Sequence, residues 1–198
     1  MANWNLPIIL GSNSPRRMQL LQSVGINPIV SAPAIDDSVY SIGEYDVAHW
    51  VQALAILKSM HIDTKDFKAG TILTADTVCV IDGRVFGKPE GAHEARLMIE
   101  KAMGETHQVY TGWCLKSCDG VQSVIGYEST DITMGHIETK VLDSYIESGN
   151  WSGKAGGYNV SERIEAGWPI EFLGDLTCAM GLPMTRLKSE FAHFGSNN

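Results

Sequence analysis

The stretch PIILGSNSPRRMQLLQSVG, residues 7–25, decides the fold, because it encodes a strand, a turn and a helix in succession. The apolar run at its start predicts a short strand. Ser14 predicts a helix N-cap, Pro15 the first helical residue and Gly25 the end of the helix. The segment therefore predicts a strand that turns directly into a helix.

Two basic residues, Arg16 and Arg17, fall in the first turn of this expected helix. The helix dipole is already positive there, and carboxylates would normally be favoured. A bound anion would offset that excess, since backbone N–H groups, the hydroxyls of Ser12 and Ser14 and two guanidinium groups would converge on it. We interpret the turn as a polyphosphate site. The alternative is that both arginines extend into solvent and meet surface partners.

The rest of the chain alternates between helical and strand-like patterns. Helices are expected over residues 46–60, 91–102, 137–147 and 183–194. Strands are expected over residues 29–31, 71–75, 78–81, 84–86, 108–115 and 121–133, with tight turns at Asp82-Gly83 and Asp119-Gly120. Because hairpins mix with strand–helix units, we expect an α/β fold with a mixed β-sheet flanked by helices.

Length and composition limit the function classes. The 198 residues suit one large domain or two close lobes, and no linker separates parts of the chain. The net charge of −8 argues against a general nucleic-acid binder but allows a local pocket for a small anion. Four cysteines without a CxxC pair suggest reduced thiols, and no signal segment or membrane span is evident. We therefore expect a soluble cytoplasmic protein.

The first candidate for chemistry is Asp76, which follows an apolar run and is expected at a strand end. A carboxylate there could bind Mg²⁺ or orient a water molecule, and Asp36 and Asp37 could supply further metal contacts. The alternatives are a turn residue at Asp76 and a solvated loop at Asp36-Asp37.

Two glycine-rich stretches add candidates. In GRVFGKP, residues 83–89, Pro89 stands where a Walker motif needs Ser or Thr, so this is no P-loop. Lys88 still places a positive charge before a helix, or is a plain surface lysine. SGKAGGY, residues 152–158, would let a backbone approach a ligand closely, or is a mobile loop.

Six motifs in register resemble the Maf family. They are SNSPRR (12–17), TADTV (74–78), GKP (87–89), GETHQVYTG (104–112), KAGGY (154–158) and GLP (181–183). The match runs from about Ile8 to Leu187, nearly the whole chain.

The resemblance implies a two-lobed α/β fold of Maf/ITPase type with an active-site cleft between the lobes. It implies one domain over residues 1–194, a polar tail at 195–198 and, as a family expectation, a homodimer. The implied activity is hydrolysis of a nucleoside triphosphate, canonical or modified, to the monophosphate and pyrophosphate with Mg²⁺ or Mn²⁺, a house-cleaning role in nucleotide metabolism.

Carried onto this sequence, the family's catalytic residues are Asp76, Lys88 and Arg17, with Ser12 and Ser14 beside the arginine. Asp37 stands where the family usually has a glutamate, and with Asp76 it is the implied metal ligand. Whether Asp76 binds metal or accepts a proton is left open by the sequence.

The residues implied to bind substrate depart from the family after Tyr158. Many members continue to a glutamine or glutamate that helps select the base. Here Ser161 aligns with it, and a one-residue slip would place Glu162 there. The other positions implied in substrate binding are Arg16, Thr77 and Lys154. The alternatives to an enzyme are a regulator that binds nucleotide without turnover and an α/β interaction domain that binds none.

Overall fold

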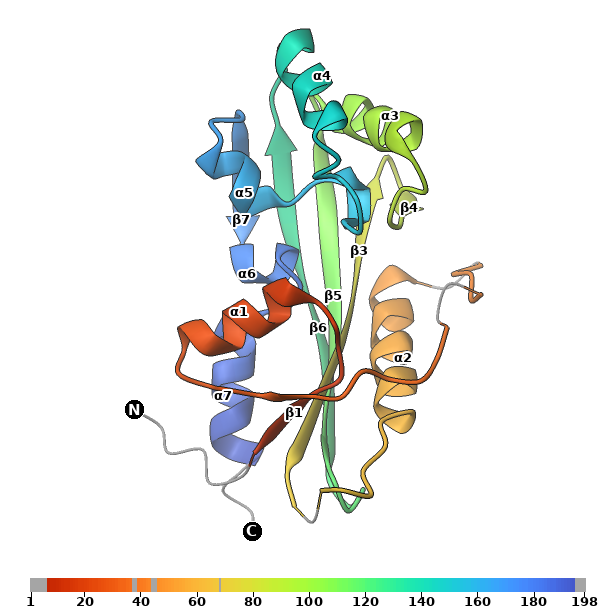
Figure 1. The fold of residues 1–198 in the computed structure, drawn as a ribbon, viewed down its shortest axis with the longest axis vertical. Helices are drawn as coiled ribbons and strands as arrows, with labels where there is room; N and C mark the ends of the chain where they lie inside the picture. The colour runs from red at the N-terminus through yellow and green to blue at the C-terminus, as the bar shows by residue number, and fades with distance from the viewer. Residues whose placement is uncertain (1–6, 37–38, 44–45, 68, 195–198) are drawn as a thin grey trace. The chain divides into compact units, whose positions relative to one another are not determined.

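The computed structural model describes residues 7–36, 39–43, 46–67 and 69–194. Its strands form one seven-stranded sheet in the order β2-β1-β3-β5-β6-β7, with β4 paired to β3 (Figure 1). Strand β1 runs parallel to both β2 and β3, whereas β4 and β7 pair antiparallel with β3 and β6. The expected mixed sheet flanked by helices is confirmed.

The strands are β1 (Ile8–Leu10), β2 (Ile29–Val30), β3 (Thr71–Ile81), β4 (Arg84–Phe86), β5 (Thr106–Ser117), β6 (Ser123–Met134) and β7 (Ile170–Gly174). The helices are α1 (Pro15–Ser23), α2 (Val47–Met60), α3 (Ala92–Ala102), α4 (Thr139–Glu147), the 3₁₀ turn η1 (Ala155–Gly157), α5 (Val160–Glu165), α6 (Leu176–Ala179) and α7 (Met184–Phe194). Within the described residues, no helix is both long and apolar enough to span a bilayer.

The opening segment folds as its sequence predicts. Strand β1 is fully buried, and α1 begins at Pro15 and ends at Ser23. Gly25 follows with a left-handed φ of 83° and donates its N–H to the carbonyl of Gln22 at 2.9 Å, the geometry that glycine favours past a helix end. Ser14 occupies the N-cap position, although its side chain makes no capping hydrogen bond.

Strand β3 corrects one expectation. It is a single strand, so Asp76 lies in its middle and not at a strand end. Polar residues do not interrupt it, because pairing with neighbours continues at both ends: residues 71–73 pair with β1 and residues 79–81 with β4. The buried Thr74 hydroxyl donates to the Ala55 carbonyl at 2.6 Å, which satisfies one of those polar groups.

The turn after β3 is the tight hairpin that its sequence predicts. Asp82 and Gly83 have φ values of 51° and 68°, and they connect Ile81 directly to its partner Arg84. Two successive residues with positive φ match the twist of a two-residue hairpin, and Asp-Gly is a preferred pair there.

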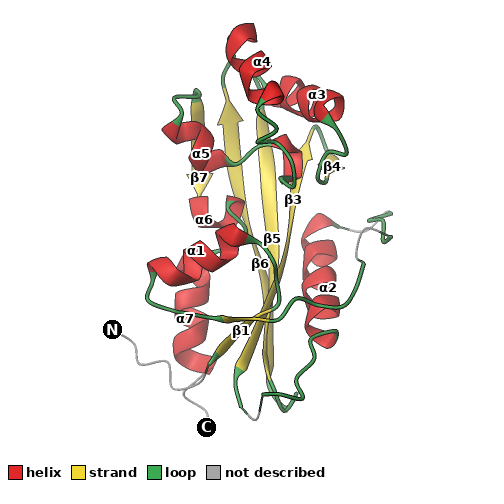
Figure 2. Ribbon diagram, in the orientation of Figure 1, coloured by secondary structure: helices red, strands yellow, loops and turns green. Residues whose placement is uncertain are grey.

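The region from residue 150 to 180 contains four short elements that the sequence analysis did not predict, η1, α5, β7 and α6. Figure 2 shows α5 and α6 as short helices before and after β7 in the chain. Each of the two helices starts at a side-chain cap: Asn159 accepts from the N–H of Glu162, and Asp175 accepts from that of Thr177. Such short helices depend on capping and packing more than on apolar periodicity.

The described chain divides into two compact units. Unit 1 contains residues up to 76, 111–128 and from 181 onward, and unit 2 contains residues 77–110 and 129–180. In unit 1, helix α2 buries Ala48, Val51, Leu54 and Ala55. Gly112 of β5 lies so close to α2 that an added Cβ would be 2.3 Å from the Val51 carbonyl carbon. Helix α2 and β5 therefore meet backbone to backbone.

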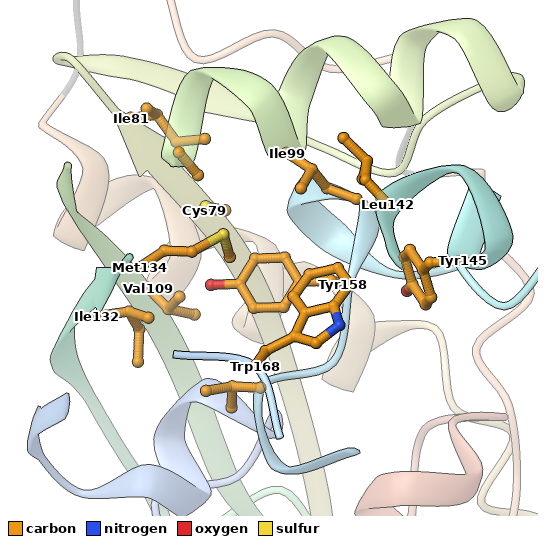
Figure 3. Close-up of a cluster of buried hydrophobic side chains, with 12 residues drawn as sticks. Cys79, Ile81, Ile99, Val109, Ile132, Met134, Leu142, Tyr145, Tyr158 and Trp168 are labelled. Atoms are coloured by element: carbon orange, nitrogen blue, oxygen red, sulfur yellow. The ribbon is translucent and has the colours of Figure 1, made fainter. Parts of the chain in front are cut away.

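Unit 2 has a separate apolar core that joins strand residues such as Ile81, Val109 and Ile132 to Ile99 of α3 and Leu142 of α4 (Figure 3). Three aromatic rings extend it. Tyr145 meets Trp168 edge to face at 5.0 Å between centroids, and Tyr158 stacks near the same indole at 6.4 Å. These contacts fix the segment that follows η1 against the sheet.

A polar pair lies beside this core. His107 Nε2 is 2.5 Å from the Tyr158 hydroxyl, and His107 Nδ1 is buried with no hydrogen-bond partner among the described residues. Burial lowers the pKa of His107 to about 4 and raises that of Tyr158 well above its usual value. Both side chains are therefore neutral near pH 7.

The buried cysteines Cys79, Cys114 and Cys178 and the half-buried Cys118 form no disulfide bonds in the structure. Burial raises the pKa of Cys79 to about 12 and also raises that of Cys114. The reduced state of the thiols stays a prediction, and the raised pKa makes the thiols of Cys79 and Cys114 poor nucleophiles near neutral pH.

The His107 pair predicts a pH-dependent stability. The unfolded imidazole titrates near pH 6.5, so the unfolded state binds more protons than the folded state between about pH 6.5 and pH 4. Stability falls as the pH drops through this window. Between pH 7 and pH 5 this group alone removes about 2 kcal/mol from the free energy of unfolding.

The expected result is that His107→Gln weakens the pH dependence of urea unfolding by that amount, whereas the exposed control His93→Gln keeps the wild-type dependence. An identical pH dependence in His107→Gln and wild type would contradict the assignment.

Candidate functional site

The turn between β1 and α1 is held by side chains that the sequence singled out. The buried Ser12 hydroxyl accepts from the Ser14 N–H at 3.2 Å and from Arg17 Nη1 at 3.1 Å. Arg17 Nε donates to the Gly181 carbonyl at 2.9 Å, which ties the first turn of α1 to the segment before α7. These bonds fix the direction of the guanidinium group.

The same bonds determine what Ser12 can offer. A hydroxyl has two acceptor lone pairs and one hydrogen. Because both lone pairs of Ser12 accept hydrogen bonds, its remaining capacity is to donate. No acidic residue lies in the first turn of α1. A hydroxyl donor and a fixed guanidinium at the positive end of a helix favour an anion.

The second feature of unit 1 is an ion pair between Lys58 and Asp76. The Lys58 ammonium lies 2.6 Å from Asp76 Oδ1, and the two side chains are 13% and 12% exposed. Lys58 comes from the last turn of α2, where the negative end of the helix dipole favours a cation. Removing one partner from such a pair would leave a charge with little water around it.

Sequence reasoning missed Lys58. The sequence predicts residues 46–60 only as a helix, and nothing about the residue type of a lysine near a helix end distinguishes it from a surface residue. The signal that exists is position: Lys58 follows Leu54 by four residues, so it lies on the buried side of α2. A lysine on a buried face needs a carboxylate partner.

The described residues contain no group of three His, Cys, Asp or Glu side chains that could hold a metal ion. Asp36 is exposed, and Asp37 lies outside the described residues. Asp76 nevertheless fits one kind of metal site. Mg²⁺ keeps several waters and is commonly held by one or two carboxylates together with the phosphates of a substrate. The donor set suits a metal that shares its ligands with a phosphate compound.

Unit 2 contains the other predicted residues. Lys88 is exposed, and the carbonyl of its neighbour Gly87 accepts from the N–H of Gly156 at 3.0 Å. Gly156 has a φ of 69°, and a Cβ there would lie 3.1 Å from Cys79 Sγ. The glycine turn at η1 is thus bonded to the segment that carries Lys88.

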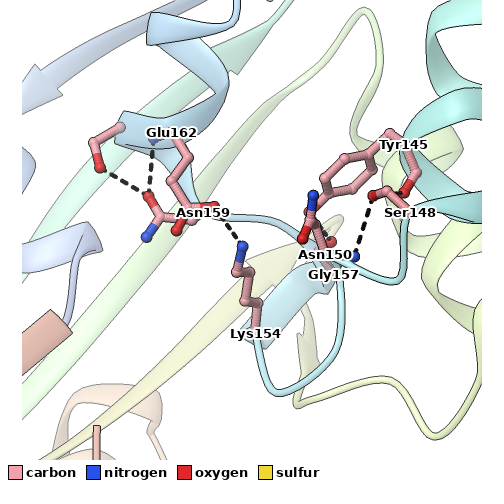
Figure 4. A network of polar contacts seen from close by, with 8 residues as sticks. Tyr145, Ser148, Asn150, Lys154, Gly157, Asn159 and Glu162 are labelled. Atoms are coloured by element: carbon pink, nitrogen blue, oxygen red, sulfur yellow. Dashed lines mark hydrogen bonds and ion pairs between the residues drawn. The ribbon is translucent and has the colours of Figure 1, made fainter. Parts of the chain in front are cut away.

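Lys154, Ser161 and Glu162 also gather in unit 2. The Lys154 side chain is 11% exposed and forms an ion pair with Glu162. Asn159 Oδ1 accepts from the Ser161 hydroxyl at 2.8 Å and from the Glu162 N–H at 3.2 Å (Figure 4). The sequence contained a signal for this arrangement, because Asn159 followed three residues later by Glu162 is a helix-start pattern. Glu162 directs its carboxylate to Lys154.

Two groups of predicted residues are therefore in contact: Ser12, Ser14 and Arg17 in unit 1, and Lys154, Ser161 and Glu162 around Asn159 in unit 2. Arg16 and Thr77 are half-buried in units 1 and 2. The roles of all these residues toward a substrate stay predictions.

Comparison with known proteins identifies a family and relatives that this chain resembles. The model of the Maf-like protein family matches residues 7–194. A protein of Symbiobacterium thermophilum named dTTP/UTP pyrophosphatase is 32% identical, over 95% of this chain and 94% of its own. Proteins of the same name from Bacillus cytotoxicus and Phocaeicola vulgatus are each 34% identical, over 95% and 92% of this chain and 95% and 93% of their own.

A solved structure of a nucleoside-triphosphatase, or dITP/XTP pyrophosphatase, from Mycobacterium abscessus is more distant. It is 12% identical with a TM-score of 0.38, over 65% of this chain and 73% of its own, a likeness too low to bear on fold or function. The match of the family model across almost the whole chain, and relatives more than 30% identical over most of it, show that this chain belongs to the Maf-like protein family.

Proposed function

We propose that this chain is a nucleoside triphosphate pyrophosphatase, which hydrolyses its substrate to the monophosphate and pyrophosphate. The observation that carries the proposal is the anchored Arg17 and Ser12 pair at the start of α1, in a chain whose relatives are named dTTP/UTP pyrophosphatases. The Lys58 and Asp76 pair, in the same unit, adds a buried carboxylate that fits a metal shared with phosphates.

In the proposed mechanism, Arg17 and the Ser12 and Ser14 hydroxyls hold phosphate oxygens and stabilise the charge that develops there. A divalent cation, Mg²⁺ or Mn²⁺, supplies further charge neutralisation when bound. Asp76 would hold it, with Asp37 as the second proposed ligand. A water oxygen bonds to the α-phosphorus as the bond to the bridging oxygen breaks, and pyrophosphate leaves. A carboxylate that binds a cation is a weak proton acceptor. We therefore assign Asp76 the role of holding the cation, and the proton of the attacking water passes to solvent.

The residues of unit 2 receive more general roles. We assign Lys88 to the phosphates and the Ser161 hydroxyl to the base, with Arg16 and Thr77 as further substrate contacts. The Lys154 and Glu162 pair supports this assignment indirectly, because it fixes the first turn of α5 where Ser161 lies. We further propose that the protein acts on nucleotides in the cytoplasm, in a house-cleaning role, and that it forms a homodimer.

The first test is a panel of canonical and modified nucleoside triphosphates, assayed for pyrophosphate release with Mg²⁺ and with Mn²⁺. We expect turnover of dTTP and UTP, by analogy with the named relatives. Binding of these nucleotides without pyrophosphate release would instead favour a regulatory protein. Neither binding nor turnover of any member would leave the interaction-domain alternative.

The second test is Asp76→Asn. The amide keeps the shape and one oxygen but loses the charge, so we expect pyrophosphate release to fall by roughly 100-fold or more while thermal unfolding stays cooperative. The matched control is Asp82→Asn in the exposed turn just after the same strand, a position that asparagine also tolerates. Full activity of Asp76→Asn would remove Asp76 from the mechanism.

The third test removes one positively charged side chain at a time. Arg17→Met and Lys88→Met are each expected to cost about 2 to 4 kcal/mol of transition-state stabilisation, or roughly 30-fold to 1,000-fold in kcat/KM. Arg186→Met is the control, since Arg186 is an exposed residue of α7 that pairs with Glu190 at 2.8 Å. If both variants keep wild-type kcat/KM, the phosphates bind elsewhere.

A further inference from the structure

The end of helix α2 fixes the position of Lys58 beside Asp76. The Lys58 carbonyl accepts from the His61 N–H at 3.1 Å, and the neighbouring Ser59 hydroxyl donates to the Ile56 carbonyl at 2.7 Å. One turn earlier, the carbonyl of Ala55 accepts from Thr74, two residues before Asp76 on β3. The last turns of α2 are thus tied to β3, and the ammonium meets Asp76 Oδ1 at 2.6 Å within this fixed frame.

This arrangement places a positive charge directly beside the carboxylate that we propose to bind a metal ion. An oxygen that already accepts from an ammonium at 2.6 Å cannot coordinate a cation in the same direction, and a second cation nearby is repelled in a site with little water. The described residues offer no group of three acidic, histidine or cysteine ligands that would compensate. Within the part of the chain that the structure describes, a lone divalent ion at Asp76 would meet this carboxylate and a competing ammonium.

A metal that arrives with a triphosphate meets different electrostatics. The phosphate oxygens supply most of its ligands. Because a metal–triphosphate complex remains a net anion, the Lys58 ammonium attracts it and no longer opposes it.

We propose that Lys58 is a positioning residue that keeps divalent metal away from Asp76 until the nucleotide is present, so that metal enters only as the metal–nucleotide complex. The proposal rests on the pyrophosphatase function proposed above. It sets an order of binding that the presence of Asp76 alone does not determine.

The test measures Mn²⁺ binding without turnover, from the electron paramagnetic resonance signal of the free aqueous ion. We expect wild type without nucleotide to show no binding up to millimolar Mn²⁺, and to bind Mn²⁺ once a non-hydrolysable α,β-substituted UTP analogue is added. Lys58→Met without nucleotide is expected to bind Mn²⁺ at least tenfold more tightly than wild type. Adding Asp76→Asn to Lys58→Met should abolish that gain.

Two further variants separate charge from structure. Lys58→Arg keeps a cation beside Asp76 and should exclude Mn²⁺ as wild type does. Lys65→Met, which removes an exposed lysine paired with Asp63 at 3.5 Å, should leave Mn²⁺ binding unchanged. Should Lys58→Met fail to fold, Lys58→Gln, which keeps a donor without the charge, carries the same expectation of tighter binding.

Micromolar Mn²⁺ binding by wild type without nucleotide would overturn the proposal, as would unchanged Mn²⁺ affinity in the folded Lys58 variants. Neither outcome depends on turnover. Failure of the pyrophosphatase proposal would appear separately, as absence of pyrophosphate release in the nucleotide panel.

Discussion

A carboxylate with little water around it needs a counter-charge, and in this chain the ammonium of Lys58 provides it for Asp76. That requirement connects two distant parts of the sequence. Helix α2 has to end where its last turn reaches β3, and β3 has to continue past its most polar stretch without breaking. The bond from Thr74 to the Ala55 carbonyl maintains the same alignment from the strand side. The chemistry that we propose depends on this local frame.

The start of α1 carries an excess of positive charge that also needs compensation. Two arginines occupy the first turn of a helix, where the dipole disfavours them. The protein compensates by directing Arg17 to the Gly181 carbonyl and the Ser12 hydroxyl. This anchoring orders the guanidinium before any ligand arrives, so less conformational entropy is lost on binding. In unit 2 the charge of Lys154 is likewise compensated within the protein, by its ion pair with Glu162.

Much of the fold could be predicted from the sequence, because strong local signals decided it. Ser14, Pro15 and Gly25 bounded α1, and Asp82-Gly83 specified a hairpin. The exceptions had weak or conflicting local signals. The polar residues around Asp76 suggested a strand end, whereas pairing on both sides kept β3 continuous. The elements between residues 150 and 180 are too short for periodicity to reveal, since capping by Asn159 and Asp175 and packing on Trp168 define them. For the candidate site, sequence motifs named Ser12, Arg17 and Asp76, but Lys58 required three-dimensional contact to find.

The backbone contact between Gly112 and Val51 has a consequence for protein engineering. Because main-chain atoms occupy the space of the missing side chain, no rotamer change can make room there for even a methyl group. A library built to alter substrate preference should leave codon 112 unvaried, since any substitution would push the helix that bears Lys58 off its strand. Diversity is better directed to Ser161, which we propose to contact the base and whose half-buried hydroxyl donates to the Asn159 side chain.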